Sequence, residues 1–169
     1  MSFKNENVEL GDMKKLAEII KDIDIAMLTT VDEKGFLRSR PMATQEMAAD
    51  GTLYFFMDTS SPKVEEISST NQVNLVYSQP DDHRYVSISG RAVVNKNKAK
   101  MKELWKPTLK AWFPEGLEDP TLGLLQVTVE QAEYWDYAGT VTEVIGLAKA
   151  LTTGHTYEGA GVHGRINNT

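Results

Sequence analysis

Short segments with strand character, separated by tight turns, fill most of this sequence and constrain its fold more than any other feature. The segments are rich in β-branched and aromatic residues, and turn formers such as those of residues 32–35 lie between them. Strands are predicted at residues 25–31, 36–44, 53–57, 73–78, 85–94, 122–129 and 132–136. Because tight turns join antiparallel neighbours, these strands predict a small antiparallel barrel. A doubly wound parallel sheet would need a regular alternation of strands and helices, which the sequence lacks.

Three segments predict helices at the periphery of this barrel. In the first, apolar residues recur at helical spacing, at Met13, Leu16, Ile20 and Ile23. The second covers residues 62–69, with Ser61 as its N-cap and a proline at its first position. The third covers residues 96–105 and is stopped by a proline. Gly90, inside a predicted strand, indicates a bulge or bend of the kind that barrels need at their corners.

Length and composition fit one compact domain. The chain has 169 residues, of which 41% are hydrophobic, enough for a core. We expect a single domain at residues 11–153, a flexible N-terminus at 1–10 and a flexible, glycine-rich tail at 154–169.

Charge and cysteine content exclude several classes of function. The net charge of −6 argues against a nucleic-acid coat and against binding to anionic membranes. The absence of cysteine excludes disulfides, thiolate nucleophiles and cysteine-based metal sites. The N-terminal residues are polar, and no segment approaches transmembrane length, so a cytoplasmic location is expected.

Two clusters stand out in this acidic chain and predict an anion site. They are Arg38-Ser39-Arg40-Pro41-Met42 and Thr59-Ser60-Ser61-Pro62-Lys63. Side chains alternate along a strand, so Arg38 and Arg40 should share one face, and the second cluster opens a helix with unpaired N–H groups. Together they favour a bound phosphate. The alternative is a solvated strand face beside an ordinary helix start, and spacing alone does not decide between them.

Other candidate groups each have an ordinary structural explanation. Glu65 and Glu66 are adjacent on the predicted helix and diverge from each other, so we interpret them as a solvated face. The three histidines lack partners at metal-binding spacing and are interpreted as surface residues. Trp105 and Trp112 are compatible with core packing, and equally with contact to an interface or a ligand ring.

The order of the two clusters and of the strands around them resembles one known family. The matching segments are residues 38–42, 59–63, 71–77, 86–92, 104–105, 111–116, 119–120 and 132–136. This pattern resembles the pyridoxamine 5'-phosphate oxidase-like FMN-binding split barrels, in particular the general stress protein 26-like branch, over roughly residues 16–151. The fold implied is mainly β (α+β), an antiparallel six- to seven-stranded split β-barrel with peripheral helices.

The resemblance also implies a cofactor and an assembly. It implies FMN bound at the interface of a homodimer and contacted by both chains. The positions that match phosphate contacts of the family are Arg40, Ser61 and Lys63. Those that match the strand beside the isoalloxazine ring are Arg38, Ser39, Pro41 and Met42. Thr59 and Ser60 match the same phosphate loop, while Trp105 and Trp112 match aromatic residues that approach the flavin from the partner chain.

The activity implied is that of a flavoprotein of the general stress type. It is either an oxidoreductase that exchanges electrons or hydride with reduced nicotinamide or another small molecule, or a non-catalytic flavin-binding protein for storage, buffering or sensing. A third alternative is a split barrel that holds a different cofactor, such as deazaflavin or haem, although the sequence offers no obvious axial ligand for a haem. Oxidation of vitamin B6 phosphates is not expected. The oxidases proper carry an Arg-Leu segment after a tryptophan, whereas here Trp135 is followed by Asp136, Tyr137 and Ala138.

Overall fold

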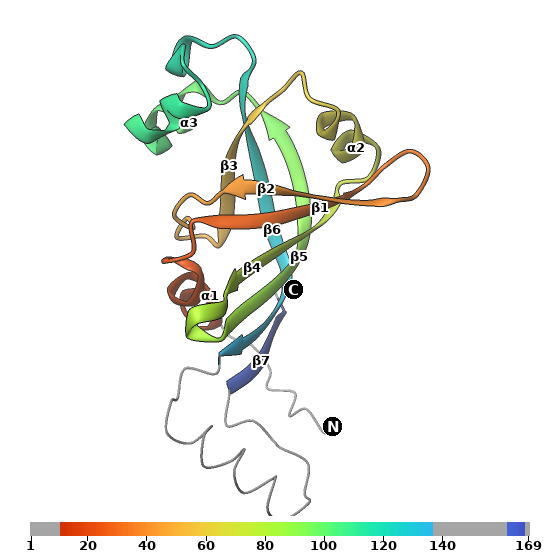
Figure 1. Ribbon diagram of the computed structural model, residues 1–169, viewed down its shortest axis with the longest axis vertical. Coiled ribbons are helices and arrows are strands. Elements are labelled where there is room, and N and C mark those ends of the chain that lie inside the picture. Colours follow the sequence, from red (N-terminus) through yellow and green to blue (C-terminus); the bar gives the residue numbers. More distant parts are fainter. Residues whose placement is uncertain (1–10, 137–161, 168–169) are drawn as a thin grey trace, which may run out of the picture.

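The computed structural model describes residues 11–136 and 162–167, which form one curled antiparallel sheet with helices around it (Figure 1). The strands are β1 (Ile25–Val31), β2 (Leu37–Ala43), β3 (Thr52–Asp58), β4 (Gln72–Gln79), β5 (Arg84–Asn95), β6 (Leu122–Asp136) and β7 (Val162–Asn167). Every pairing between them is antiparallel. This architecture confirms the predicted split barrel.

The sheet order is β2-β1-β4-β5-β6-β3. Strand β7 is an additional partner of β6 and is not part of this order. One edge of β6 follows β5 along almost its whole length. The other edge pairs with β3 over residues 122–128 and then with β7 over residues 131–136. Within the described residues the pairing stops at β2 on one side and at β3 on the other, so the curled sheet stays open.

Gly90 marks the point where β5 and β6 change register. The pairing shifts between Ser89 and Gly90, which confirms the predicted bulge. A side chain is excluded at Gly90, because a Cβ there would lie 2.4 Å from the carbonyl oxygen of Thr128. The missing side chain therefore lets two strands approach closely while the sheet bends.

The helices cover two separate apolar clusters. The first is the main core, to which α1 (Gly11–Ile20) contributes Leu16, Ile19 and Ile20 and α2 (Lys63–Ser69) contributes Ile67. The second lies on the other face of β3, under α3 (Lys98–Leu104) and the short 3-10 turns η2 (Pro107–Ala111) and η3 (Gly116–Glu118). Residues 52–57 are buried on both faces, which explains why this strand is apolar at every position from Leu53 to Met57 rather than alternating.

Two findings change the set of strands that the sequence predicted. The strands predicted at 122–129 and 132–136 are one strand, β6. Residues 162–167 were predicted to lie in a flexible tail, yet they form β7. A buried Ile166 and a close contact of Gly164 with the ring of Tyr134 explain this pairing, since any side chain at Gly164 would overlap that ring. The glycine that suggested flexibility thus serves packing.

The other predicted flexible residues, 1–10, 154–161 and 168–169, lie outside the described residues, as do residues 137–153 of the predicted domain, and the domain limits at 11 and 153 stay predictions. A further short turn, η1 (Pro80–Asp82), joins β4 to β5. Among the described helices, none combines the length and the apolar character needed to cross a membrane.

Candidate functional site

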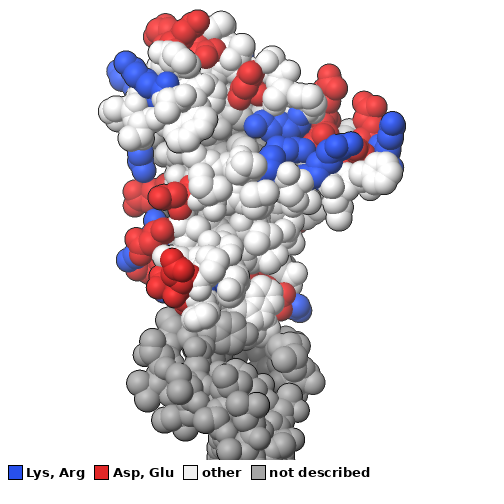
Figure 2. All heavy atoms as spheres, viewed as in Figure 1, with Lys and Arg blue, Asp and Glu red and all other residues white. Residues whose placement is uncertain are grey.

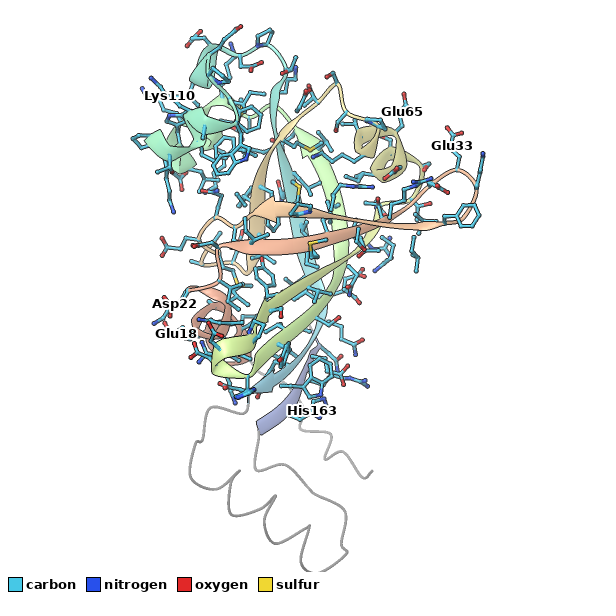
Figure 3. All side chains as sticks on the ribbon, in the orientation of Figure 1. Glu18, Asp22, Glu33, Glu65, Lys110 and His163 are labelled. Carbon is cyan, nitrogen blue, oxygen red and sulfur yellow. The ribbon has the colours of Figure 1, made fainter. Side chains whose placement is uncertain are left out.

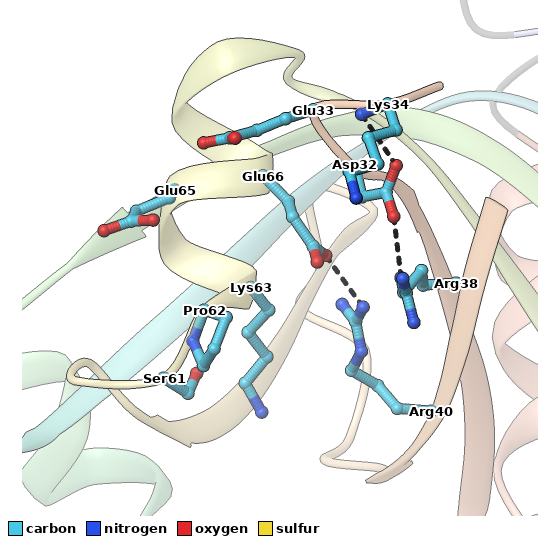
Figure 4. A pocket seen from close by; sticks show the side chains of 10 residues that line it. All are labelled: Asp32, Glu33, Lys34, Arg38, Arg40, Ser61, Pro62, Lys63, Glu65 and Glu66. Atoms are coloured by element: carbon cyan, nitrogen blue, oxygen red, sulfur yellow. Dashed lines mark hydrogen bonds and ion pairs between the residues drawn. The ribbon is translucent and has the colours of Figure 1, made fainter. Parts of the chain in front are cut away.

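A hollow of about 640 Å³ lies between α2 and the turn that joins β1 to β2. It is lined by Asp32, Glu33, Lys34, Arg38, Arg40, Ser61, Pro62, Lys63, Glu65 and Glu66 (Figure 4). Figure 2 shows Lys and Arg atoms gathered on this side of the molecule, with Asp and Glu atoms among them. The two predicted clusters therefore meet in space, and both arginines reach the same hollow, as the strand alternation predicted.

Arg40 is held by two side chains on neighbouring elements. Its Nη1 donates to Oγ1 of Thr30 on β1 at 2.7 Å, and its Nη2 donates to Oε2 of Glu66 on α2 at 2.7 Å. The hydroxyl of Thr30 donates to the same Oε2 at 2.5 Å. Arg40 is thus part of a closed, largely buried network that ties α2 to the sheet, rather than a free cation on the strand.

The pKa of Glu66 reflects two opposing influences, burial and its hydrogen-bonded, positively charged neighbours. Burial alone would raise the pKa of its carboxyl, while the hydrogen bonds from Thr30 and Arg40 and the positive charges of Arg40 and Arg38 lower it. The net pKa lies below the usual value of a glutamate. The carboxylate therefore carries its negative charge at neutral pH.

Arg38 also has a carboxylate partner, at the edge of the hollow. Its Nε donates to Oδ2 of Asp32 at 2.8 Å, and its side chain remains 59% exposed. This hydrogen bond, with others from the backbone of Phe36 and Lys34, holds the pKa of Asp32 below its usual value. Only the Arg38 side of this ion pair is exposed, since the side chain of Asp32 is 13% exposed.

Lys63 differs from both arginines. It is half-buried at the start of α2, and its Nζ donates to the sulfur of Met42 at 3.7 Å, the one acceptor assigned to it among the described residues. Burial and the nearby charge of Arg40 lower its pKa, although Asp58 acts in the opposite direction. An ammonium group that is partly desolvated and paired only with a thioether is poorly satisfied, which suits it to an incoming anion.

Ser61 is not the N-cap that the sequence predicted, because Pro62 occupies that position and the helix has no side-chain cap hydrogen bond. The carbonyl oxygen of Ser61 accepts from the backbone N–H of Val64 at 3.1 Å, while its hydroxyl oxygen is buried and has no hydrogen-bond partner among the described residues. A buried hydroxyl without a partner is costly, so it too is suited to a ligand atom.

Ser39, Pro41, Thr59 and Ser60, which belong to the same two clusters, do not line the hollow. Ser39 and Pro41 face the opposite side of β2 from the arginines, and the Ser39 hydroxyl pairs with that of Thr29 at 2.8 Å. The Thr59 hydroxyl donates to the carbonyl oxygen of Thr121, and the Ser60 hydroxyl donates to Asp58. Of the predicted residues, the hollow thus joins Arg38, Arg40, Ser61 and Lys63.

The two tryptophans are not part of the hollow within one chain. Trp105 packs its ring edge-on against Phe56, with centroids 5.5 Å apart, in the second apolar cluster. Trp112 is 63% exposed. In Figure 3, Lys110 on the same segment lies across the molecule from Glu33 and Glu65, which border the hollow.

Comparison with known proteins places the chain in a family. The family model described as pyridoxamine 5'-phosphate oxidase like matches residues 11–158. The chain belongs to this family.

Individual relatives of this pyridoxamine 5'-phosphate oxidase-like protein point to one branch. General stress protein 26 of Bacillus subtilis is 29% identical over 136 residues, 78% of this chain and 92% of that protein. A solved structure from Jannaschia sp. CCS1, a candidate general stress protein 26, is 20% identical and covers 95% of this chain and 100% of that one, with a TM-score of 0.74. The general stress FMN/FAD binding protein of Xanthomonas citri is 26% identical, covering 76% of this chain and 91% of that one with a TM-score of 0.66. The resemblance expected from the sequence is confirmed.

In this family member, the side chains that bind Arg40 were not predicted from the sequence. Glu66 was interpreted as solvated, yet its side chain is only 12% exposed and binds Arg40. Thr30 was interpreted only as part of a buried strand. One signal was available, because Glu66 follows Lys63 by three residues and so shares its helix face. Nothing in the sequence indicated that this face would meet β1 and β2.

Proposed function

We propose that this protein binds FMN, with the flavin phosphate held in the hollow by Lys63, Ser61 and Arg40. The observation that carries the proposal is the pair of poorly satisfied groups at one place, a half-buried ammonium with only a sulfur acceptor and a buried hydroxyl with none among the described residues. A phosphate supplies oxygen acceptors to both, and Arg40 can add charge-assisted hydrogen bonds. Membership in the pyridoxamine 5'-phosphate oxidase-like family supports the same ligand.

The isoalloxazine ring is proposed to lie along β2. This strand ends the sheet, so among the described residues one edge of its backbone has no strand partner and can offer polar groups to a ring. Arg38, Ser39, Pro41 and Met42 lie on this strand. Thr59 and Ser60 would shape the phosphate loop through their contacts with Thr121 and Asp58 rather than touch the phosphate.

The name of the Xanthomonas citri protein leaves two flavins to consider, FMN and FAD. We propose FMN, because the groups described above account for one terminal phosphate. The absorption spectrum of the purified protein, and the identity of the flavin released on denaturation, test this directly.

A bound flavin would supply electron or hydride transfer, with reduced nicotinamide or a small oxidant as partner. The chain would supply position and electrostatics. The carboxyls of Asp32 and Glu66 that border the hollow have lowered pKa values, so neither holds a proton to donate at neutral pH. A second candidate is a non-catalytic flavin-binding protein of the stress type. Steady-state turnover with NADH or NADPH separates the two, since a binding protein would not oxidise either.

Binding should depend on the phosphate of the ligand. We expect riboflavin to bind clearly less tightly than FMN, because it cannot pair with Lys63 or Ser61, and we expect inorganic phosphate to compete weakly with FMN. Fluorescence titrations of both flavins, with and without phosphate, measure this. Equal affinities for FMN and riboflavin would contradict the assignment of the phosphate to the hollow.

The protein is proposed to act as a homodimer, with Trp105 and Trp112 of each chain near the flavin of the other. The sheet face away from the core exposes Ile25, Met27 and Val76, and Trp112 is exposed as well, which together leave apolar surface for a second copy to cover. Sedimentation should therefore give twice the mass of one chain. A single-chain mass with flavin still bound would contradict this prediction.

A further inference from the structure

We propose that Glu66 is a built-in counter-anion for Arg40 that limits how tightly this protein can hold a phosphate. The inference rests on the proposed function, namely that the hollow receives a flavin phosphate. It assigns to Glu66 the control of flavin affinity, and so of how readily the flavin exchanges.

The geometry is a closed triangle across three elements. Arg40 on β2 donates to Thr30 and Glu66 at 2.7 Å each, and Thr30 on β1 donates to the same Glu66 oxygen. Thr30 is 1% exposed, and the side chains of Arg40 and Glu66 are 22% and 12% exposed. Figure 4 shows the Glu66 carboxylate directed at the guanidinium of Arg40 rather than toward solvent. The negative charge is thus fixed beside the cation on which a phosphate would depend.

Charges around the hollow balance. Its lining holds four carboxylates and four cations, Asp32, Glu33, Glu65 and Glu66 against Lys34, Arg38, Arg40 and Lys63. Both arginines are paired with carboxylates in the structure. Lys63 is therefore the half-buried cation whose charge remains available to a ligand. A phosphate that approaches Arg40 also approaches Glu66, and the repulsion between two anions offsets part of the attraction.

Arg40 need not leave Glu66 when a phosphate binds. A guanidinium has five N–H donors, and the triangle uses one donor on each of its two Nη atoms. The remaining donors can turn to a phosphate while Thr30 and Glu66 keep the side chain in place. Glu66 consequently has two opposite effects, because it positions Arg40 and also neutralises it. The substitution Glu66→Gln separates these effects, since an amide oxygen can still accept from Arg40 and Thr30 but carries no charge.

Titration of FMN and riboflavin into the native protein and Glu66→Gln tests the proposal. We expect Glu66→Gln to bind FMN about three- to tenfold more tightly and to leave riboflavin affinity unchanged. Glu65→Gln is the matched control. It alters charge by the same amount on the same helix and borders the same hollow, but it does not contact Arg40, so we expect FMN affinity within about twofold of native.

Each other result overturns the inference in a distinguishable way. If the native protein prefers FMN to riboflavin but Glu66→Gln binds FMN no more tightly, Glu66 does not limit affinity, and the proposed function stands. If Glu65→Gln tightens FMN equally, the effect is one of general charge. If the native protein does not distinguish the two flavins, the phosphate assignment fails first. If Glu66→Gln melts at a markedly lower temperature, the titrations are repeated well below that temperature, where the variant is folded.

Discussion

Replacing Lys63 with alanine is expected to weaken FMN binding by about ten- to a hundredfold. A charge-assisted hydrogen bond contributes roughly 1.5–3 kcal/mol, and each 1.4 kcal/mol is a factor of about ten in affinity. The loss should be larger than that from Arg38→Ala, because Arg38 is exposed and already paired with Asp32. Lys63 is instead half-buried and has only a sulfur acceptor within the described part of the chain. Titration of FMN followed by flavin fluorescence measures the change.

The flavin-free protein should tolerate Lys63→Ala. The pKa of Lys63 is lowered in the folded protein, so the unfolded chain holds this proton more tightly, and the charge opposes folding at neutral pH. Removing it should leave the melting temperature unchanged or slightly raised. Lys34→Ala is the control within the same hollow, since Lys34 is exposed on the β1–β2 turn, and it should change FMN affinity by no more than about twofold. Unaltered FMN affinity in Lys63→Ala would place the phosphate elsewhere.

Arg40→Ala should behave differently, because it removes the cation from the Thr30–Glu66 network. We expect it to weaken FMN binding and also to lower stability, since Glu66 would be left largely buried without its partner.

The largest effect on stability is expected from Gly90→Ala, about 3 kcal/mol or more. The added Cβ would lie 2.4 Å from a backbone oxygen of β6 and 3.1 Å from a methyl carbon of Val127. Because the nearer atom belongs to the backbone, relief requires β5 and β6 to separate where the register shifts. Urea unfolding curves give the free energy of unfolding for comparison with the native protein.

Gly35→Ala is the matched comparison. Gly35 has a positive φ of 81°, but a Cβ added there would meet no atom of the described residues within 4 Å, so its substitution costs only backbone strain, about 1 kcal/mol. Equal losses in the two variants would show that close approach at Gly90 is not what the bulge requires.

How far the sequence predicts this structure depends on whether local pattern or distant pairing decides each element. The strand at Ile25–Val31 was predicted with its observed limits, because a buried apolar segment followed by a turn specifies it locally. Strand β7 was missed, since its glycine and polar residues resemble a loop until Tyr134 and β6 are beside it. Pairing between segments so distant in sequence leaves no local signature.

The same division holds for the site. Two arginines and a lysine were predicted to gather around an anion, and the structure brings them to one hollow. Their carboxylate partners were not predicted, because the contact of Glu66 with Arg40 depends on how α2 lies against the sheet. The net charge of a site is therefore harder to predict from sequence than the cationic residues that line it.

Strand β3 has a consequence for synthesis of the chain. Residues 53–57 of this strand are apolar and buried on both faces, and among the described residues its one strand partner is β6, which begins only at residue 122. At about 5–20 residues per second, a ribosome needs several seconds to reach that partner. During this time the segment Leu53-Tyr54-Phe55-Phe56-Met57 lacks both its strand partner and the later residues that bury it. Its composition favours intermolecular β pairing. The nascent protein should accordingly depend on a holding chaperone more than the finished barrel does.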